Sequence, residues 1–303
     1  MIQLKFHLMS PFTGRLPFTG GPLRAAFLNL LRQADAELSS QVHDASEVRT
    51  YSLDPFPYDR QFMTLFKEGE EYTFGVNLLD SEHYARAIRQ LVIANRTGIR
   101  LYHHLFPVRR IDLEQVNLET TMASWVEEFK RARRNSVVVT MYFLTPTQLS
   151  MYGSDMGCLL PQPERVFPAL LRVWNRINQA TSLERVSDYR EWVEKNVSVS
   201  YHRIHTETVP LGRGRDFVGF VGKVVYVVGD RNSPFAALTG GLARFAEVSN
   251  IGKNRTAGLG RVRTVLETAA EGRGRKTRIR RGESVSRTGR GQTKNTQTTS
   301  AKV

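Results

Sequence analysis

Residues 2–8 alternate between apolar and polar side chains, which is the period of a strand with one buried face. The apolar side chains on that face are Ile2, Leu4, Phe6 and Leu8. After a connection rich in Gly and Pro, the apolar residues between Leu23 and Ala34 recur at the spacing of a helix. Asp35 can cap a second, short helix that ends at His43-Asp44. These patterns predict a strand followed by two helices.

The rest of the first half continues this alternation of elements. Strands are predicted over 48–53, 71–79 and 98–112. Ser81 can cap a helix between the last two of these strands. The resulting order, β-α-β-β-α-β, is that of a ferredoxin-like unit.

The same order returns in the second half, after a bridge over 113–134. The elements predicted there are a strand over 136–144, a helix after Pro163, strands over 197–209 and 216–228, a helix over 235–249 and a strand over 259–265. Two consecutive copies of one pattern indicate a tandem architecture. We therefore predict an α+β fold of two tandem ferredoxin-like (RRM-like) βαββαβ domains, at residues 1–130 and 131–266.

The composition changes from about Glu267, where Gly, Thr, Ser, Arg and Lys dominate and apolar residues nearly vanish. Such a segment cannot bury enough apolar surface to offset its ordering entropy, so we predict a disordered basic C-terminal tail over 267–303. Ten Lys or Arg and two Asp or Glu in 271–303 supply +8 of the formal net charge of +14. A surplus of this size indicates nucleic acid as a partner before a membrane. A protein with nothing more than a basic tail would show the same surplus.

Cys158 is the only cysteine, which excludes a disulfide framework and a cysteine-cluster zinc site and fits a reducing cytoplasm. No apolar run approaches the roughly 20 residues that span a bilayer. The alternating first strand is not a signal peptide. We therefore expect a cytoplasmic protein. Because no His has Asp or Glu partners at ligand spacing, neither a metal nor another cofactor is expected.

A cationic loop, with glycines at 252, 258 and 260, joins the helix that ends at Asn250 to the last strand. Glycine lacks a Cβ and accepts positive φ, so such a loop lets the backbone approach a phosphate chain closely. The order of helix and then strand excludes a dinucleotide-binding fingerprint, and Glu247 stands where a Walker loop needs glycine. Taken alone, the loop is equally consistent with a plain helix C-cap and glycine turn.

Residues 250–262, NIGKNRTAGLGRV, resemble the C-terminal glycine-rich signature of the CRISPR-associated RAMP endoribonucleases, which cut precursor repeat RNA into guide RNAs. Other stretches agree with that family in order: Thr145-Pro-Thr147, Leu160-Pro-Gln-Pro163, Gly219-Phe-Val-Gly222, and Val42-His43 ahead of Tyr51-Ser-Leu53. The resemblance covers about residues 1–265. It implies the same tandem ferredoxin-like fold that the patterns predict.

The resemblance also implies a metal-independent endoribonuclease that cleaves CRISPR repeat RNA. The 2′-OH next to the scissile phosphate attacks it, and the products are a 2′,3′-cyclic phosphate and a 5′-OH. This chemistry needs a proton acceptor, a proton donor and a cation that stabilises the phosphorane. Two alternatives stay open: a catalytically inactive RAMP subunit that binds guide RNA, and a general RNA-binding protein.

His43 matches the family's catalytic histidine, and imidazole suits proton transfer because its pKa lies near neutrality. Without the resemblance, His43 would be a helix-end residue stabilised by the helix dipole. Arg49 lies near the position of a lysine in related enzymes, and Tyr51 could replace the tyrosine that they carry in the first helix. The first helix of this chain has Phe27 and no phenol in that region.

The RNA-binding residues implied by the resemblance are Gly252, Lys253, Asn254, Arg255, Thr256, Gly258, Gly260 and Arg261. The implied partner is the precursor CRISPR repeat RNA, with a CRISPR effector complex as a further one. No membrane is expected, and the chain is expected to be a monomer or a homodimer.

Overall fold

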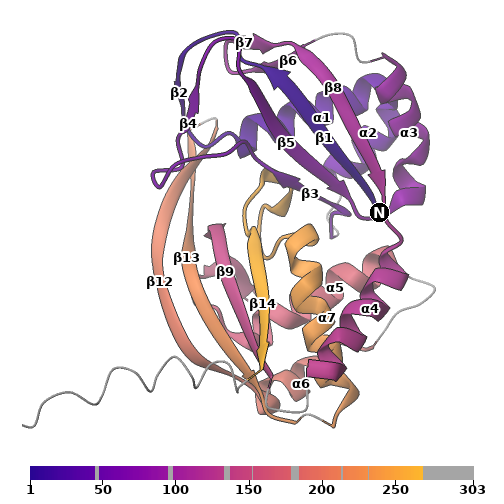
Figure 1. The fold of residues 1–303 in the computed structure, drawn as a ribbon, viewed down its shortest axis with the longest axis vertical. Coiled ribbons are helices and arrows are strands. Elements are labelled where there is room, and N and C mark those ends of the chain that lie inside the picture. Colours follow the sequence, from indigo (N-terminus) through magenta and orange to yellow (C-terminus); the bar gives the residue numbers. More distant parts are fainter. Residues whose placement is uncertain are drawn as a thin grey trace, which may run out of the picture.

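The computed structural model describes residues 1–44, 48–94, 98–132, 137–151, 153–178, 184–212, 214–230 and 232–268. They form two halves, each with one four-stranded antiparallel sheet and helices packed on one face (Figure 1). The described residues end at Thr268, so nearly all of the tail predicted over 267–303 lies outside them. The fold is the predicted one: two tandem ferredoxin-like units.

The first sheet has the strand order β3-β5-β1-β8. Its strands are β1 (Ile2–Met9), β3 (Tyr51–Asp54), β5 (Glu71–Leu78) and β8 (Val108–Gln115). Its helices are α1 (Gly20–Ala34), α2 (Ala36–Asp44) and α3 (Ser81–Ala94). The alternation in β1 places Leu4 and Phe6 in the core beneath these helices. A small sheet of β2 (Gly14–Leu16) and β4 (Thr64–Phe66) is added at one end.

The second sheet repeats the topology with the order β12-β13-β9-β14. Its strands are β9 (Val137–Thr147), β12 (Val197–Gly212), β13 (Arg215–Val228) and β14 (Val262–Thr268). Its helices are α5 (Pro163–Ile177), α6 (Val186–Asn196) and α7 (Pro234–Ser249). A hairpin of β10 (Leu149–Met151) and β11 (Ser154–Cys158) follows β9, and a short 3-10 turn, η3 (Arg255–Ala257), interrupts the glycine loop.

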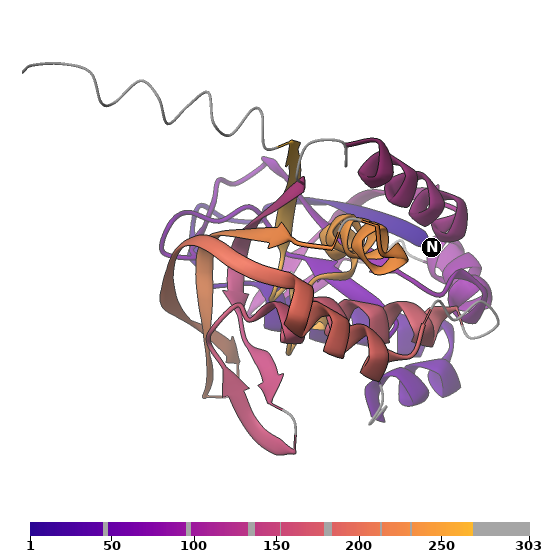
Figure 2. The same ribbon diagram turned by 90° about the horizontal axis from the view of Figure 1, so that it is seen from below.

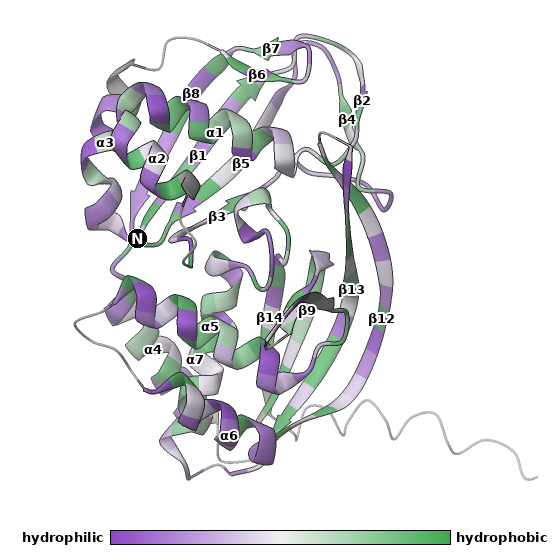
Figure 3. Ribbon diagram, turned by 180° about the vertical axis from the view of Figure 1, so that it is seen from behind, coloured by the Kyte–Doolittle hydropathy of each residue, from purple (hydrophilic) through white to green (hydrophobic). Residues whose placement is uncertain are grey.

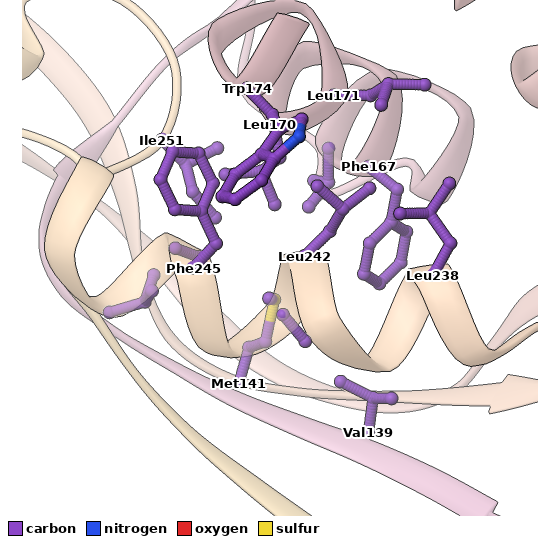
Figure 4. Close-up of a cluster of buried hydrophobic side chains, with 14 of the residues drawn as sticks. Val139, Met141, Phe167, Leu170, Leu171, Trp174, Leu238, Leu242, Phe245 and Ile251 are labelled. Atoms are coloured by element: carbon purple, nitrogen blue, oxygen red, sulfur yellow. The ribbon is translucent and has the colours of Figure 1, made fainter. Parts of the chain in front are cut away.

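The core of the second half is the contact of α5 with α7 over β9, as Figure 4 shows. The Trp174 and Phe245 rings meet edge to face, with centroids 5.3 Å apart. The hydropathy colouring shows apolar residues along α5 and α7 (Figure 3), and apolar residues of both helices belong to one core cluster. The view from below shows the two helices next to each other (Figure 2). Apolar helix stripes predicted from the sequence are therefore what joins the layers.

One predicted strand was wrong, and the predicted bridge has more regular structure than the sequence indicated. The strand expected over 98–112 is a hairpin of β6 (Ile99–Leu101) and β7 (His104–Phe106), followed by β8. Tyr102 turns the chain with a φ of 53°, which apolar periodicity cannot foresee. The bridge expected over 113–134 consists of the end of β8 and the helix α4 (Leu118–Ala132).

Helix α4 buries Leu118, Met122 and Phe129 in the core of the second half. The Phe129 ring packs closely on α7, because a Cβ added at Gly240 of that helix would lie 1.9 Å from the ring. We therefore propose that the second domain begins near residue 117, rather than at 131.

The two halves are also joined by the long ribbon of β12 and β13, which reaches up to the first half (Figure 1). Its end buries Val209 and Phe217 against Phe18, which precedes α1. A Cβ at Gly21 would lie 2.4 Å from the carbonyl oxygen of Leu211. The end of this ribbon therefore packs on the segment that leads into α1 and on the start of that helix.

Candidate nucleic-acid interface and catalytic residues

A groove of about 430 Å³ lies where the two halves meet. The segment before β3, the β10–β11 hairpin, helix α5 and the glycine loop all contribute to its walls. Four arginines line it, namely Arg49, Arg165, Arg172 and Arg255, and the described lining residues include no Asp or Glu. An excess of positive charge in a concave site concentrates anions, RNA phosphates among them.

Helix α5 carries a row of three arginines along one face. Arg165, Arg172 and Arg176 follow at intervals of seven and four residues, which places them on the same side of a helix. Arg165 donates a hydrogen bond to the carbonyl oxygen of Ser150 on β10, 3.1 Å away. Arg172 is exposed and has no hydrogen bond or ion pair within the part of the chain that the structure describes. Sequence reasoning missed this row, although its helical spacing was a visible signal.

The glycine loop is mostly buried between the halves. Arg255 is only 8% exposed. Its guanidinium donates to the carbonyl oxygens of Ser249, at 2.6 Å, and Arg49, at 2.7 Å. Burial, and then the nearby Arg49, lower the pKa of Arg255 to about 10. One carbonyl belongs to each half, so Arg255 links the glycine loop to the segment that precedes β3.

The glycines of the loop are required by contacts within the protein. Gly260 has a φ of 70°, and a Cβ there would lie 1.7 Å from the carbonyl oxygen of Ile251. Gly258 has a φ of 74°, and its Cβ would lie 2.7 Å from Pro55 of the first half. Neither glycine lines the groove. The packing therefore explains these two glycines without RNA, and their predicted contact with RNA stays a prediction.

The edge of the loop that faces the groove is formed by Gly252, Asn254 and Thr256. Lys253 is half-buried, and its Nζ donates to the carbonyl oxygens of Asp155, at 2.7 Å, and Met156, at 3.3 Å, on the β10–β11 hairpin. Contact of this edge with RNA stays a prediction, as does a role for Lys253 beyond its hold on the hairpin.

Arg261 is not among the residues that line the groove. Its Nε is 2.8 Å from Oδ1 of Asp54, and both side chains are about one third exposed. The residue lines a second cavity with the open face of the first sheet. Arg261 therefore forms an ion pair with Asp54 that links the two halves. Its contact with RNA stays a prediction, and that RNA would bind at a surface other than the groove.

His43 lies in the last turn of α2, and its side chain is outside the described residues. A cavity of about 290 Å³, which adjoins the groove, is lined by the neighbouring Val42 and by His83. Arg49 lines both cavities. Burial lowers the pKa of Arg49, and the positive charge of Arg24 lowers it further. The end of α2 and Arg49 therefore face the same junction.

Tyr51 lies in the core and has no exposed surface. Its ring centroid is 5.5 Å from that of Phe27 on α1. Burial raises the pKa of its phenol. Its phenol is enclosed by the protein in this structure, and the predicted catalytic role of Tyr51 stays a prediction.

Replacing Arg255 with alanine is expected to lower the free energy of unfolding by roughly 3 kcal/mol, because hydrogen bonds from a charged group contribute about 1.5–3 kcal/mol each and two carbonyls would lose their donor. Urea denaturation followed by circular dichroism measures this. Arg263→Ala is the matched control, since Arg263 is exposed on β14 and is expected to change stability by less than about 1 kcal/mol. Equal effects of the two substitutions would contradict the linking role of Arg255.

Within the described residues, no three His, Cys, Asp or Glu side chains come together as a metal site would require. None of the described helices has the length and apolar character needed to cross a membrane.

This chain is similar to known proteins in sequence and in fold. Residues 141–262 match the family model of the CRISPR-associated endoribonuclease Cas6. A CRISPR-associated endoribonuclease Cas6 of Streptococcus thermophilus is 22% identical over 209 residues, which are 67% of this chain and 79% of the relative.

Solved structures share the fold. A product complex of a Thermus thermophilus Cas6 superposes with a TM-score of 0.66 at 24% identity, over 87% of this chain and 98% of that one. A structure described as a RAMP protein binding different RNA substrates has a TM-score of 0.54 at 10% identity, over 88% of this chain and 100% of that one.

Proposed function

We propose, from the premise that this chain is a relative of the CRISPR-associated endoribonucleases named Cas6, that it cleaves CRISPR repeat RNA to generate guide RNAs without a metal ion. The ribose 2′-OH attacks the adjacent phosphate, and the products end in a 2′,3′-cyclic phosphate and a 5′-OH. The observation that carries the proposal is the groove at the junction of the halves, whose described lining residues include four arginines and no carboxylate.

The charge of this groove supports RNA as the ligand. Arg172, exposed on α5, has no carboxylate partner among the described residues, so an incoming phosphate does not have to displace one. Arginine also presents several donors in a fixed fork that matches phosphate oxygens. An RNA seated here would lie between the glycine loop of the second half and the end of α2 in the first half.

The position of α2 supports His43 as the group that transfers protons. Its backbone ends the helix beside a cavity that adjoins the groove. Arg49 lines both cavities, and a guanidinium there would stabilise the negative charge that develops on the phosphorane. Gly252, Asn254 and Thr256, at the groove edge of the glycine loop, would hold the RNA backbone.

Cleavage of repeat RNA is expected to proceed at an undiminished rate in EDTA, because the proposed mechanism uses protein side chains for proton transfer and charge stabilisation. Denaturing gel electrophoresis of end-labelled repeat RNA, with EDTA or with Mg²⁺, measures this. An RNA of the same composition in scrambled order is the control. A strict requirement for Mg²⁺ would refute the metal-free mechanism.

A second candidate function, RNA binding without cleavage, is supported by the open face of the second sheet. Arg203, Lys223, Tyr142 and Arg263 lie opposite one another across the four strands. The Nζ of Lys223 is 5.6 Å and the Cζ of Arg263 is 4.7 Å from the centre of the Tyr142 ring. Cations beside a tyrosine on an open sheet suit single-stranded nucleic acid. Binding of repeat RNA with no cleavage in either buffer would favour this function.

A further inference from the structure

The last turn of α7 ends against the first half, and its backbone is capped from there. The final carbonyl groups of a helix have no partner within the helix. The carbonyl oxygen of Val248 accepts hydrogen bonds from the hydroxyl of Ser52 on β3 and from the side-chain amide of Asn77 on β5, the latter at 3.2 Å. Both donors belong to the first half, whereas α7 belongs to the second. One half therefore supplies a helix cap to the other.

Hydrogen bonds cross this contact in both directions. The side-chain amide of Asn250, which follows α7, donates to the carbonyl oxygen of Leu53 on β3, at 3.1 Å. Asn77 also donates to the hydroxyl oxygen of Ser52 and accepts from the amide of Gln3 on β1, both at 3.1 Å. Asn77 is 5% exposed, and Ser52 and Asn250 have no exposed surface. Both ends of the Asn77 amide are therefore held inside the protein.

Buried hydrogen bonds fix the register of two surfaces more strictly than apolar contacts do. They are directional, and a buried donor or acceptor that loses its partner is unfavourable, so β3 does not slide along the end of α7 without breaking them. The segment that enters β3 carries Arg49, which lines the groove and the cavity beside the end of α2. A shift of β3 would therefore move Arg49 relative to the groove walls that the second half provides. Asn77 lines neither of these cavities.

We propose that Asn77 is a positioning residue, which fixes β3 on the end of α7 and thereby sets where Arg49 lies relative to α5 and the glycine loop. The inference rests on the proposed function, in which groups from both halves act on one phosphate. A displacement of about 1 Å at a reacting group can slow a reaction by about 10²-fold. Asn77 would influence cleavage in this way without touching the RNA.

The experiment compares Asn77→Asp with Asn196→Asp. Asp keeps the shape of Asn but replaces the amide donor with an acceptor, which the carbonyl of Val248 repels. Asn196→Asp makes the same change at the end of α6, where the amide donates to the carbonyl oxygen of Trp192 within a single half. We expect Asn77→Asp to slow single-turnover cleavage at saturating protein by about 10²-fold, and Asn196→Asp to cut at the wild-type rate.

Affinity separates positioning from a loss of RNA contacts. The affinity of Asn77→Asp for repeat RNA should change by less than about threefold, because the cations that line the groove are untouched. Ser52→Ala, which leaves Asn77 as a donor to Val248, should slow cleavage by about tenfold, and it serves as the test if Asn77→Asp does not fold. A normal rate in the folded variant, or a loss of affinity as large as the loss of rate, would overturn the positioning role.

A distance measurement decides the question without cleavage. Arg32→Cys on α1 and Lys195→Cys on α6, both exposed, take spin labels in a chain whose single native cysteine is removed by Cys158→Ser. Pulsed electron paramagnetic resonance then gives the distribution of distances between the halves. Asn77→Asp should broaden or shift this distribution and Asn196→Asp should not, whereas a loss of stability alone leaves the folded protein unchanged.

An unchanged distance distribution in Asn77→Asp would overturn the inference. A broadened distribution in Asn77→Asp, together with no cleavage by the wild type, would support the positioning of the halves and count against the proposed reaction alone.

Discussion

Alanine in place of His43 is expected to slow cleavage of repeat RNA by about 10²–10⁴-fold, the contribution typical of a positioned general acid or base. Imidazole exchanges protons near neutral pH, whereas a methyl group transfers none. Affinity for the RNA should change little, because the cations that line the groove are untouched. Single-turnover cleavage at saturating protein, together with a filter-binding titration, separates the two quantities.

His83 offers a matched control for that substitution. It is exposed on α3 and lines the same small cavity as the end of α2. We expect His83→Ala to cut at the wild-type rate. If His83→Ala loses activity and His43→Ala keeps it, the proton transfer belongs to α3, and the assignment of His43 fails.

A single 2′-deoxy nucleotide immediately before the scissile phosphate is expected to abolish cleavage at that phosphate, because the missing hydroxyl is the proposed nucleophile. Binding should persist, since most contacts in a cationic groove go to phosphates and not to one ribose. Gel analysis of the products measures the loss. The unmodified RNA should yield a 2′,3′-cyclic phosphate that acid opens to a mixture of monophosphates.

The same deoxy substitution one nucleotide away provides the control, and cleavage there should be normal. Cutting of the RNA that lacks the critical 2′-OH would contradict the mechanism and would indicate an attacking water instead. If water were the nucleophile, there would also be no reason to expect activity in EDTA. The deoxy substitution and the EDTA experiment are therefore two tests of the same mechanism.

The topology was predictable because each half repeats one alternation of strand and helix periods. Leu4 and Phe6 of β1, and Leu238 and Leu242 of α7, lie in the cores that their spacing predicted. Periodicity failed where a turn depends on one residue in an unusual conformation, as at Tyr102. It also missed α4, whose amphipathic stripe is buried by a helix more than a hundred residues away, α7.

The candidate site was predictable only in part. The resemblance pointed to His43 and Arg49, and both belong to the segments beside the junction. The three arginines on α5 recur at a helical spacing that is visible in the sequence. The sequence does not show that this face of the helix borders a groove.

The glycine loop shows most clearly what each level decides. By itself, the sequence determined a cationic turn with glycines at 258 and 260, since residues with a Cβ are strained at positive φ. Only the tertiary structure decided what that turn contacts. Gly258 packs against Pro55 and Gly260 against Ile251, at distances that leave no room for a Cβ. Arg255 donates hydrogen bonds to two backbone carbonyls, one from each half. Whether a cationic side chain is exposed to solvent or buried depends on segments that are distant in the chain. The sequence of the loop therefore does not determine it, and the packing of the two halves does.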